Sequence, residues 1–285
     1  MPEERSSPNT RYLVPAPVRW FFVLLSRIWP AQAARIGARL FCTPMRGVVK
    51  PAEEPVMAAA EHFTVDVAGE RLAGYAWGEG PTVLLVHGWG SRASRLTPLV
   101  EPLNEAGFRA VAFDAPAHGD SEGKRTTGVY YARAVRGVAE RVGELHGIVT
   151  HSMGGWVASL ALQQGLRTER AVFIAPPHDM KYYSDQFARH AGFTIAVQER
   201  AERNLESETG VPWSHLGPDD IYGGHDIPLL VIHDRDDPVS PVEQGRMVHE
   251  AWAGSELYLT RGLGHRRIVA DPAVIARVVE FITGG

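Results

Sequence analysis

Three residues that could together carry nucleophilic chemistry each follow a short apolar run. Ser152 precedes a pair of glycines at 154–155, Asp237 ends an acidic cluster, and His265 follows a glycine. A serine hydroxyl is a weak nucleophile that needs an imidazole to take its proton, and the imidazole needs a carboxylate that sets its tautomer. The chain order Ser, Asp, His, with separations of 85 and then 28 positions, therefore predicts an acyl-transfer triad.

The apolar runs that precede these residues predict the elements that position them. From residue 82 onward, short runs rich in β-branched residues alternate with helical patterns; they cover 83–86, 110–113, 147–150, 171–174, 229–232 and 257–259. Such runs predict parallel strands buried on both faces, and a hairpin is predicted over 62–77 before them. We expect an α/β fold: a mostly parallel sheet flanked by helices, with its site beyond the carboxyl ends of the strands.

The serine itself is predicted to lie on a sharp turn between a strand and a helix. The run His151-Ser-Met-Gly-Gly155 has small residues after the serine, which such a turn needs because backbone there presses against backbone. Thr150 occupies the position two before the serine, where glycine is usual.

Two further loops complete a resemblance to the α/β-hydrolase superfamily that runs from His62 to the C-terminus. The run His87-Gly-Trp-Gly90 follows the first parallel strand, as the superfamily's His-Gly loop does. The run Asp114-Ala-Pro-Ala-His-Gly-Asp-Ser121 is similar to a second superfamily loop, with Ala117 where glycine is usual. The Gly-His pair before the C-terminal helix also agrees with the superfamily pattern.

The resemblance implies a role for each site residue. Ser152 would be the nucleophile, His265 the general base and Asp237 the acid that orients it. The backbone N–H groups of Trp89 and Met153 would form the oxyanion hole. No carboxylate occupies the nucleophile position, which excludes the superfamily's haloalkane dehalogenases and epoxide hydrolases.

These roles predict a serine hydrolase of the carboxylesterase kind, acting on a small-molecule ester with an apolar acyl group through an acyl-enzyme. A thioesterase, C–C hydrolase, lyase or perhydrolase on the same triad stays an alternative, because fold and triad do not determine the substrate. A binding protein that had lost catalysis is expected to have a broken triad, whereas all three members are present here. His87, His118 and His151 are expected to hydrogen-bond their loops, because one base suffices.

The choice of Asp237 rests on the register of the acidic cluster. In the superfamily the acid is usually followed by two variable residues, then a valine and often a proline, and both Asp236 and Asp237 fit this pattern. Placing Pro241 on the proline of that pattern selects Asp237, and the same register makes Ser240 the N-cap of the next helix. Asp236 would then point away from the imidazole, since adjacent residues of an extended segment face opposite ways.

The interval from 176 to 226 is too long for an ordinary connection and predicts a small helical cap. Tyr183, Phe187 and Trp213 in this cap are candidates for an apolar substrate pocket. The domain prediction is an N-terminal extension over 1–60 and a hydrolase domain over 61–285 that contains the cap.

Composition excludes several other classes of protein. The 285 residues are 45% hydrophobic and carry a formal charge of −4, without the basic excess of a nucleic-acid-binding protein. Neither a phosphate-binding glycine motif nor a metal-ligand cluster occurs, so no cofactor and no metal are expected. Cys42, the only cysteine, permits a reducing compartment, and a cytoplasmic protein is expected. The apolar segment around Trp20–Leu25 is too short to span a bilayer, and it leaves open a peripheral membrane contact or a membrane-surface lipid hydrolase.

Overall fold

The computed structural model describes residues 14–284, which form two compact units. The sheet unit comprises Cys42–Asp179 and Thr209–Gly285, and the helical unit comprises Met180–Glu208 together with the N-terminal residues up to Phe41. No helix within residues 14–284 combines the length and the apolar character that crossing a membrane requires.

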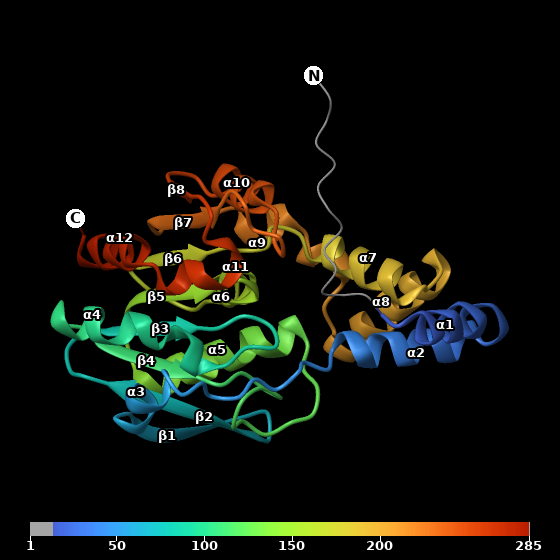
Figure 1. Cartoon of the computed structure of the whole chain (residues 1–285), viewed down its shortest axis with the longest axis horizontal. Coiled ribbons are helices and arrows are strands. Elements are labelled where there is room, and N and C mark those ends of the chain that lie inside the picture. The colour runs from blue at the N-terminus through green and yellow to red at the C-terminus, as the bar shows by residue number, and fades with distance from the viewer. Residues whose placement is uncertain (1–13, 285) are drawn as a thin grey trace. The chain divides into compact units, whose positions relative to one another are not determined.

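An eight-stranded sheet forms the centre of the sheet unit (Figure 1). Its spatial order is β1-β2-β4-β3-β5-β6-β7-β8. The first two strands form the predicted hairpin, β2 runs antiparallel to β4, and all other neighbours are parallel. The strands are β1 (Glu61–Val67), β2 (Glu70–Trp77), β3 (Thr82–Val86), β4 (Arg109–Phe113), β5 (Leu145–His151), β6 (Arg170–Ile174), β7 (Leu229–Asp234) and β8 (Glu256–Thr260). The α/β fold class predicted from the apolar runs is confirmed.

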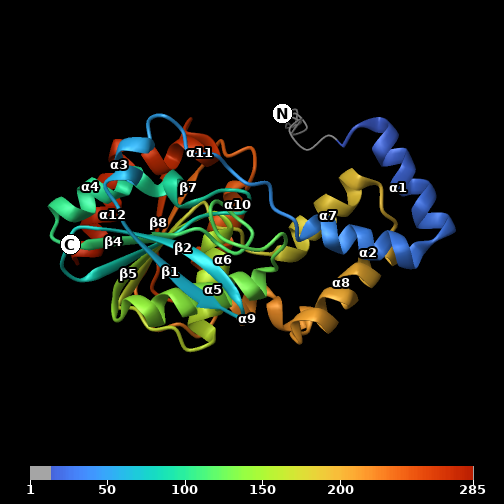
Figure 2. The ribbon, with the colours of Figure 1, turned by 90° about the horizontal axis from the view of Figure 1, so that it is seen from below.

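Helices pack on both faces of this sheet (Figure 2). The helices α5 (Gly128–Val142) and α6 (Met153–Gln163) pack on each other and on β3, and α9 (Pro218–Tyr222) and α10 (Val242–Ala251) continue this layer. The other layer contains the 3-10 helices η2 (Ala93–Leu99) and η4 (Ile268–Ala270), with α4 (Val100–Glu105) and α12 (Pro272–Thr283). Shorter elements are α3 (Glu54–Ala58), η3 (Trp213–Leu216) and α11 (Gly264–Arg267). The strands β3 and β7, each paired on both sides, are buried along their whole length, which explains their continuous apolar sequences.

The boundary expected at residue 60 does not coincide with the boundary between the units. Residues 42–60 belong to the sheet unit, because Met57 packs in its core and the indole of Trp77 donates a hydrogen bond to the carbonyl of Val56. Glu53 also accepts hydrogen bonds from Ser94 and Arg95. The part of the N-terminal extension that belongs to the helical unit ends at Phe41.

The helical unit combines two segments that are distant in sequence. The N-terminal helices α1 (Ala16–Ile28) and α2 (Pro30–Phe41) pack together and against α7 (Met180–Ala191), and α8 (Ile195–Thr209) completes the group. The core of this unit contains Phe22, Leu25 and Val197 with the small side chains of Ala33 and Ala34. The inserted segment after β6 is therefore divided, since α7 and α8 belong to the helical unit while η3 and α9 belong to the sheet unit.

Candidate active site

Ser152 occupies the turn between β5 and α6 in a strained backbone conformation. Its φ is 55° and its ψ is −126°, a region that L-residues rarely adopt. The turn is held by the N–H of Ser152, which donates to the carbonyl of Ile174 in β6 (2.8 Å). Gly154 is required because an added Cβ would come within 2.4 Å of the carbonyl oxygen of Val86. Thr150 is fully buried within β5, and the turn keeps its positive φ with threonine there.

The structure brings the three residues of the predicted triad into one hydrogen-bonded chain. Nε2 of His265 lies 3.0 Å from Oγ of Ser152, and Nδ1 of His265 lies 2.7 Å from Oδ2 of Asp237. Ionised Asp237 can only accept, so Nδ1 of the neutral imidazole carries the hydrogen and Nε2 is left as an acceptor. In this arrangement the Ser152 hydroxyl donates to Nε2, which is the geometry a general base needs.

Asp237 is held as a carboxylate by its hydrogen bonds. Burial, the largest influence, raises the pKa of Asp237, but the hydrogen bond from His265 and those from the backbone outweigh it and hold the pKa below its ordinary value. The backbone donors are the N–H groups of Val239 (2.7 Å) and Ser240 (2.9 Å), both on Oδ1. Oδ1 of Asp237 thus accepts hydrogen bonds from the backbone, and Oδ2 accepts the hydrogen bond from the imidazole.

The two neighbouring acids bind the backbone of the loop that carries His265. Asp234 accepts from the N–H groups of Leu263 (3.1 Å) and Gly264 (3.0 Å). Asp236 accepts from the N–H of Gly262 (3.0 Å). These contacts place His265, and they were not predicted from the sequence. The signal that could have indicated them is the alternating orientation of residues along an extended strand end, which gives Asp234 and Asp237 different directions.

The helix after this cluster begins later than the sequence predicts. The first residue of α10 is Val242, Pro241 occupies the N-cap position, and no side chain caps the helix. The predicted capping role of Ser240 is therefore wrong. Its N–H is instead used by Asp237, because the chain turns back toward the carboxylate at this point.

His151 contacts the loop of the imidazole from the opposite side. Its Nε2–H donates to the backbone carbonyl of His265 (2.7 Å), and the two rings lie 4.9 Å apart. Burial, followed by the proximity of His265, lowers the pKa of His151 to about 3, so the ring is neutral at physiological pH. The expected role of His151 as a hydrogen-bond partner of its loop is confirmed.

The predicted oxyanion donors lie on the two segments nearest the serine. Met153 is the first residue of α6, where backbone N–H groups have no partner within the helix. On the other side, Gly88 approaches so closely that an added Cβ would lie 2.9 Å from Cβ of Ser152. This glycine lets the backbone of the His87–Gly90 loop approach the nucleophile. The role of Trp89 and Met153 as oxyanion donors stays a prediction.

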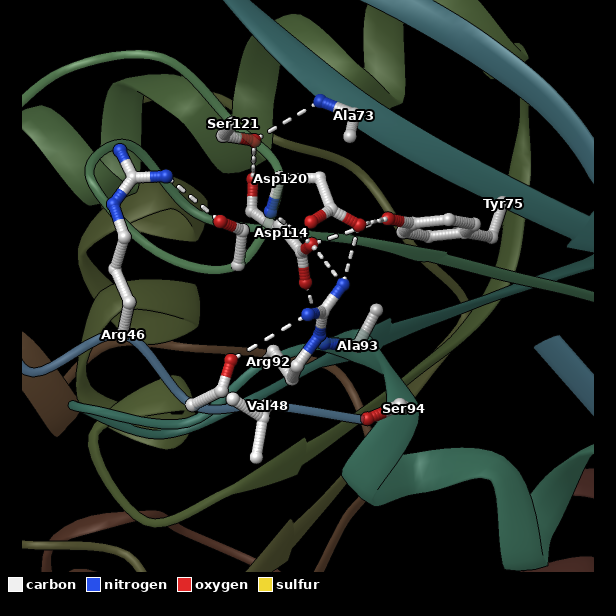
Figure 3. Close-up of polar contacts among 12 residues, drawn as sticks. Arg46, Val48, Ala73, Tyr75, Arg92, Ala93, Ser94, Asp114, Asp120 and Ser121 are labelled. Carbon is white, nitrogen blue, oxygen red and sulfur yellow. Dashed lines mark hydrogen bonds and ion pairs between the residues drawn. The ribbon is translucent and has the colours of Figure 1, made fainter. Parts of the chain in front are cut away.

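A buried ion network ties this loop to the loop over Asp114–Ser121 (Figure 3). The carboxylate of Asp114 is fully buried and accepts from the N–H of Ala93 (2.8 Å) and from the guanidinium of Arg92 (3.2 Å). Arg92 also pairs with Asp120 (2.5 Å), and both acids accept from the hydroxyl of Tyr75. A buried charge pair needs such additional hydrogen bonds to offset its desolvation, and here they fix two loops relative to the sheet.

Two buried histidines complete the link between these loops. Nε2 of His87 accepts from the N–H of Ala115 (3.0 Å), and Nε2 of His118 accepts from the N–H of Gly90 (3.0 Å). Burial lowers the pKa of His87 to about 4 and that of His118 to about 3, so both are neutral and able to accept. Their predicted roles as loop-fixing partners are confirmed.

The second loop departs from the usual glycine pattern at Ala117, which nevertheless keeps a left-handed φ of 64°. Glycine is required at position 119 of the same loop, because its φ is 43° and an added Cβ would lie 2.0 Å from the carboxylate of Asp114. The alanine therefore carries a backbone strain that glycine would not.

The predicted pocket residues belong to different units. Tyr183 and Phe187 lie on α7 in the helical unit, where the ring of Phe187 packs at 5.4 Å from Phe41 and 6.0 Å from Phe193. Trp213 begins η3 in the sheet unit and is half-buried. Their role in substrate binding stays a prediction.

Comparisons with known proteins agree with this architecture. Residues 80–210 match a protein-family model described as Hydrolase_4, serine aminopeptidase, S33. The human protein ABHD12B is 24% identical over 265 residues, which cover 81% of this chain and 70% of that protein.

Solved structures give the same result for the fold. The esterase Pf2001 of Pyrococcus furiosus is 21% identical, with a TM-score of 0.67 over 85% of this chain and 97% of that one. A membrane phospholipase A described as a bacterial virulence factor is 18% identical, with a TM-score of 0.64 over 96% of this chain and 98% of that one. The sheet order and these solved structures together show that the chain has the α/β-hydrolase fold.

Proposed function

We propose that this protein is a carboxylic ester hydrolase that works through an acyl-enzyme on Ser152. The observation that carries the proposal is the chain of short contacts from Ser152 through His265 to Asp237, on a serine held in a strained turn. An ordinary strand-to-helix turn needs neither the strain nor an imidazole beside its hydroxyl.

In the proposed reaction, Oγ of Ser152 attacks the acyl carbon while Nε2 of His265 takes the hydroxyl proton. The tetrahedral intermediate collapses, and the alcohol leaves with that proton. Water then attacks the acyl-enzyme, gives a proton to Nε2, and the acid is released as the serine recovers its hydrogen. Asp237 stabilises the imidazolium formed in each half-reaction and keeps Nδ1 protonated.

The oxyanion hole of this mechanism consists of the N–H groups of Met153 and Trp89. Both are backbone donors on segments fixed by neighbouring contacts, so they need little reorganisation as charge develops on the acyl oxygen. Loss of one such donor typically lowers the rate about 10²–10³-fold.

Labelling by a fluorophosphonate probe tests the nucleophile directly. The wild-type protein is expected to be labelled at Ser152, and Ser152→Ala is expected to abolish labelling while leaving the melting temperature close to that of the wild type. Ser159→Ala, which changes a buried serine of the same helix, is the matched control and should keep full labelling. Labelling that persists in Ser152→Ala, or disappears in Ser159→Ala without unfolding, would contradict the assignment.

The acyl specificity is tested with p-nitrophenyl esters of increasing chain length. An apolar acyl pocket predicts that kcat/KM rises with chain length, and Tyr183→Ala or Trp213→Ala should shift this preference more than the melting temperature. Matched thioesters distinguish a thioesterase. Amino-acid p-nitroanilides test for aminopeptidase activity, because the matched family model is described as a serine aminopeptidase.

A further inference from the structure

The first helix presents an apolar face that the helical unit does not cover. Trp20, Phe21, Leu24 and Ile28 recur at helical spacing on α1, and between 54% and 63% of each residue is exposed. Trp29 at the end of the helix is 66% exposed. A run of large apolar residues on one exposed face marks an interaction surface, whereas isolated exposed residues need no explanation.

The opposite face of α1 is already used for packing. Phe22 and Leu25 are buried in the core of the helical unit, and the hydroxyl of Ser26 bonds back to the carbonyl of Phe22 (2.6 Å). The helix is therefore anchored by its inner side. The exposed stripe, defined as Trp20, Phe21, Leu24, Ile28 and Trp29, is not needed for the fold of the unit.

The two N-terminal helices carry charge of a single sign. Residues 14–41 contain four arginines and no acidic residue. Arg19 and Arg27 lie on α1 and Arg35 lies on α2, and all three are exposed. A surface that combines apolar and aromatic residues with arginines complements the anionic headgroups and outer acyl region of a lipid bilayer.

Two features favour a bilayer over a second copy of this chain. A symmetric contact through the stripe would bring arginines of one copy toward those of the other, and no acidic residue within 14–41 would compensate them. The tryptophans Trp20 and Trp29 also have indole rings suited to the headgroup level, where one end is apolar and the other is hydrated.

The length of the helix determines how it would meet the membrane. The 13 residues of α1 extend about 20 Å, whereas the hydrocarbon core of a bilayer is about 30 Å thick. We infer that α1 lies in the plane of an anionic membrane surface, with its exposed stripe buried among the lipids and its arginines at the headgroups. This inference does not depend on the proposed ester hydrolysis.

Co-sedimentation with vesicles of phosphatidylcholine, with and without phosphatidylglycerol, tests the inference on the full chain. The wild type is expected to sediment with the anionic vesicles and much less with the neutral ones. Leu24→Ser with Ile28→Ser should lower the partition coefficient about tenfold or more. Arg19→Gln with Arg27→Gln should reduce the preference for anionic vesicles about thirtyfold, since each of the two basic residues near such a surface contributes about 1 kcal/mol.

A matched variant separates the stripe from general surface hydrophobicity. Ile195→Ser with Met247→Ser removes two other aliphatic side chains, which are 75% and 41% exposed, and it should bind like the wild type. Circular dichroism and the melting temperature verify that each variant folds, because all changed positions are exposed.

The inference is overturned if the wild type fails to bind anionic vesicles, or if the stripe variant binds as well as the wild type. Equal loss in the matched variant also overturns it. Light scattering tests the second-copy alternative: a dimer that Leu24→Ser with Ile28→Ser dissociates, without vesicle binding by the wild type, would assign the stripe to a subunit interface.

Discussion

The orientation of His265 by Asp237 gives a prediction that follows atom by atom from the structure. In Asp237→Asn, the N–H groups of Val239 and Ser240 still point at the Oδ1 position and need an acceptor there. The carboxamide oxygen must therefore take that place, and its NH2 group then faces Nδ1 of His265. A donor at this point forces Nδ1 to accept, which moves the ring hydrogen to Nε2.

An imidazole with its hydrogen on Nε2 cannot accept the proton of Ser152. The expected result is a loss of about 10⁴ in kcat, the size seen when a triad histidine is held in the wrong tautomer. This loss corresponds to about 5.5 kcal/mol of transition-state stabilisation. The folded protein should change little, because the new side chain is isosteric and both backbone donors keep their acceptor.

The assay is steady-state hydrolysis of a p-nitrophenyl ester, with fluorophosphonate labelling rates as a second measure of nucleophilicity. Asp236→Asn is the matched control, because its carboxamide oxygen can still accept from the N–H of Gly262 and it does not contact the imidazole. Its kcat should stay within about threefold of the wild type. A larger loss in Asp236→Asn than in Asp237→Asn would refute the assigned roles.

Three further predictions concern stability. Ala117→Gly should raise the free energy of unfolding in urea by about 0.5–1 kcal/mol, because relief of a left-handed alanine exceeds the entropy cost of glycine; a decrease would contradict the strain argument. Gly154→Ala should lower the same quantity by about 1–3 kcal/mol, since its methyl group would meet a backbone carbonyl at 2.4 Å; unchanged stability would mean that the turn adapts freely. Burial lowers the pKa values of His87, His118 and His151 in the folded protein to about 4, 3 and 3, from an ordinary value of 6.5. Unfolded chains therefore bind more protons below about pH 6.5. Stability should therefore fall as pH decreases from about 6.5 to about 4, by up to ~1.4 kcal/mol per pH unit for each histidine; urea titrations that give a constant value over this range would refute it.

The helical unit shows what local patterns do not reveal. The helices α1 and α2 pack with α7, although about 140 residues separate them in the chain. Each helix carries its own apolar face, and nothing in a local pattern says which other face will cover it. For the same reason the expected boundary at residue 60 missed the contacts of Met57 and Val56 with the sheet unit.

The acidic cluster also shows, within one loop, a difference between what the sequence predicts and what tertiary contacts decide. The sequence indicated that only one of three neighbouring acids would face the imidazole, and it favoured Asp237 in part through a capping role for Ser240 that the structure does not show. The structure places Asp237 against His265 for another reason, because two backbone N–H groups hold its carboxylate while Asp234 holds the loop opposite.

The sequence by itself determined the α/β sheet and the elements that carry the site. Buried parallel strands must be continuous apolar runs, and a strained turn beside close-packed backbone must have small residues. Both features can therefore be recognised within a short stretch of sequence. Only the tertiary structure decided which helices share a unit, which carboxylate meets the histidine, and that one face of α1 is left exposed by the described part of the helical unit. Those outcomes depend on contacts between residues far apart in the chain, and the free energy of such contacts is set by geometry that no single segment contains.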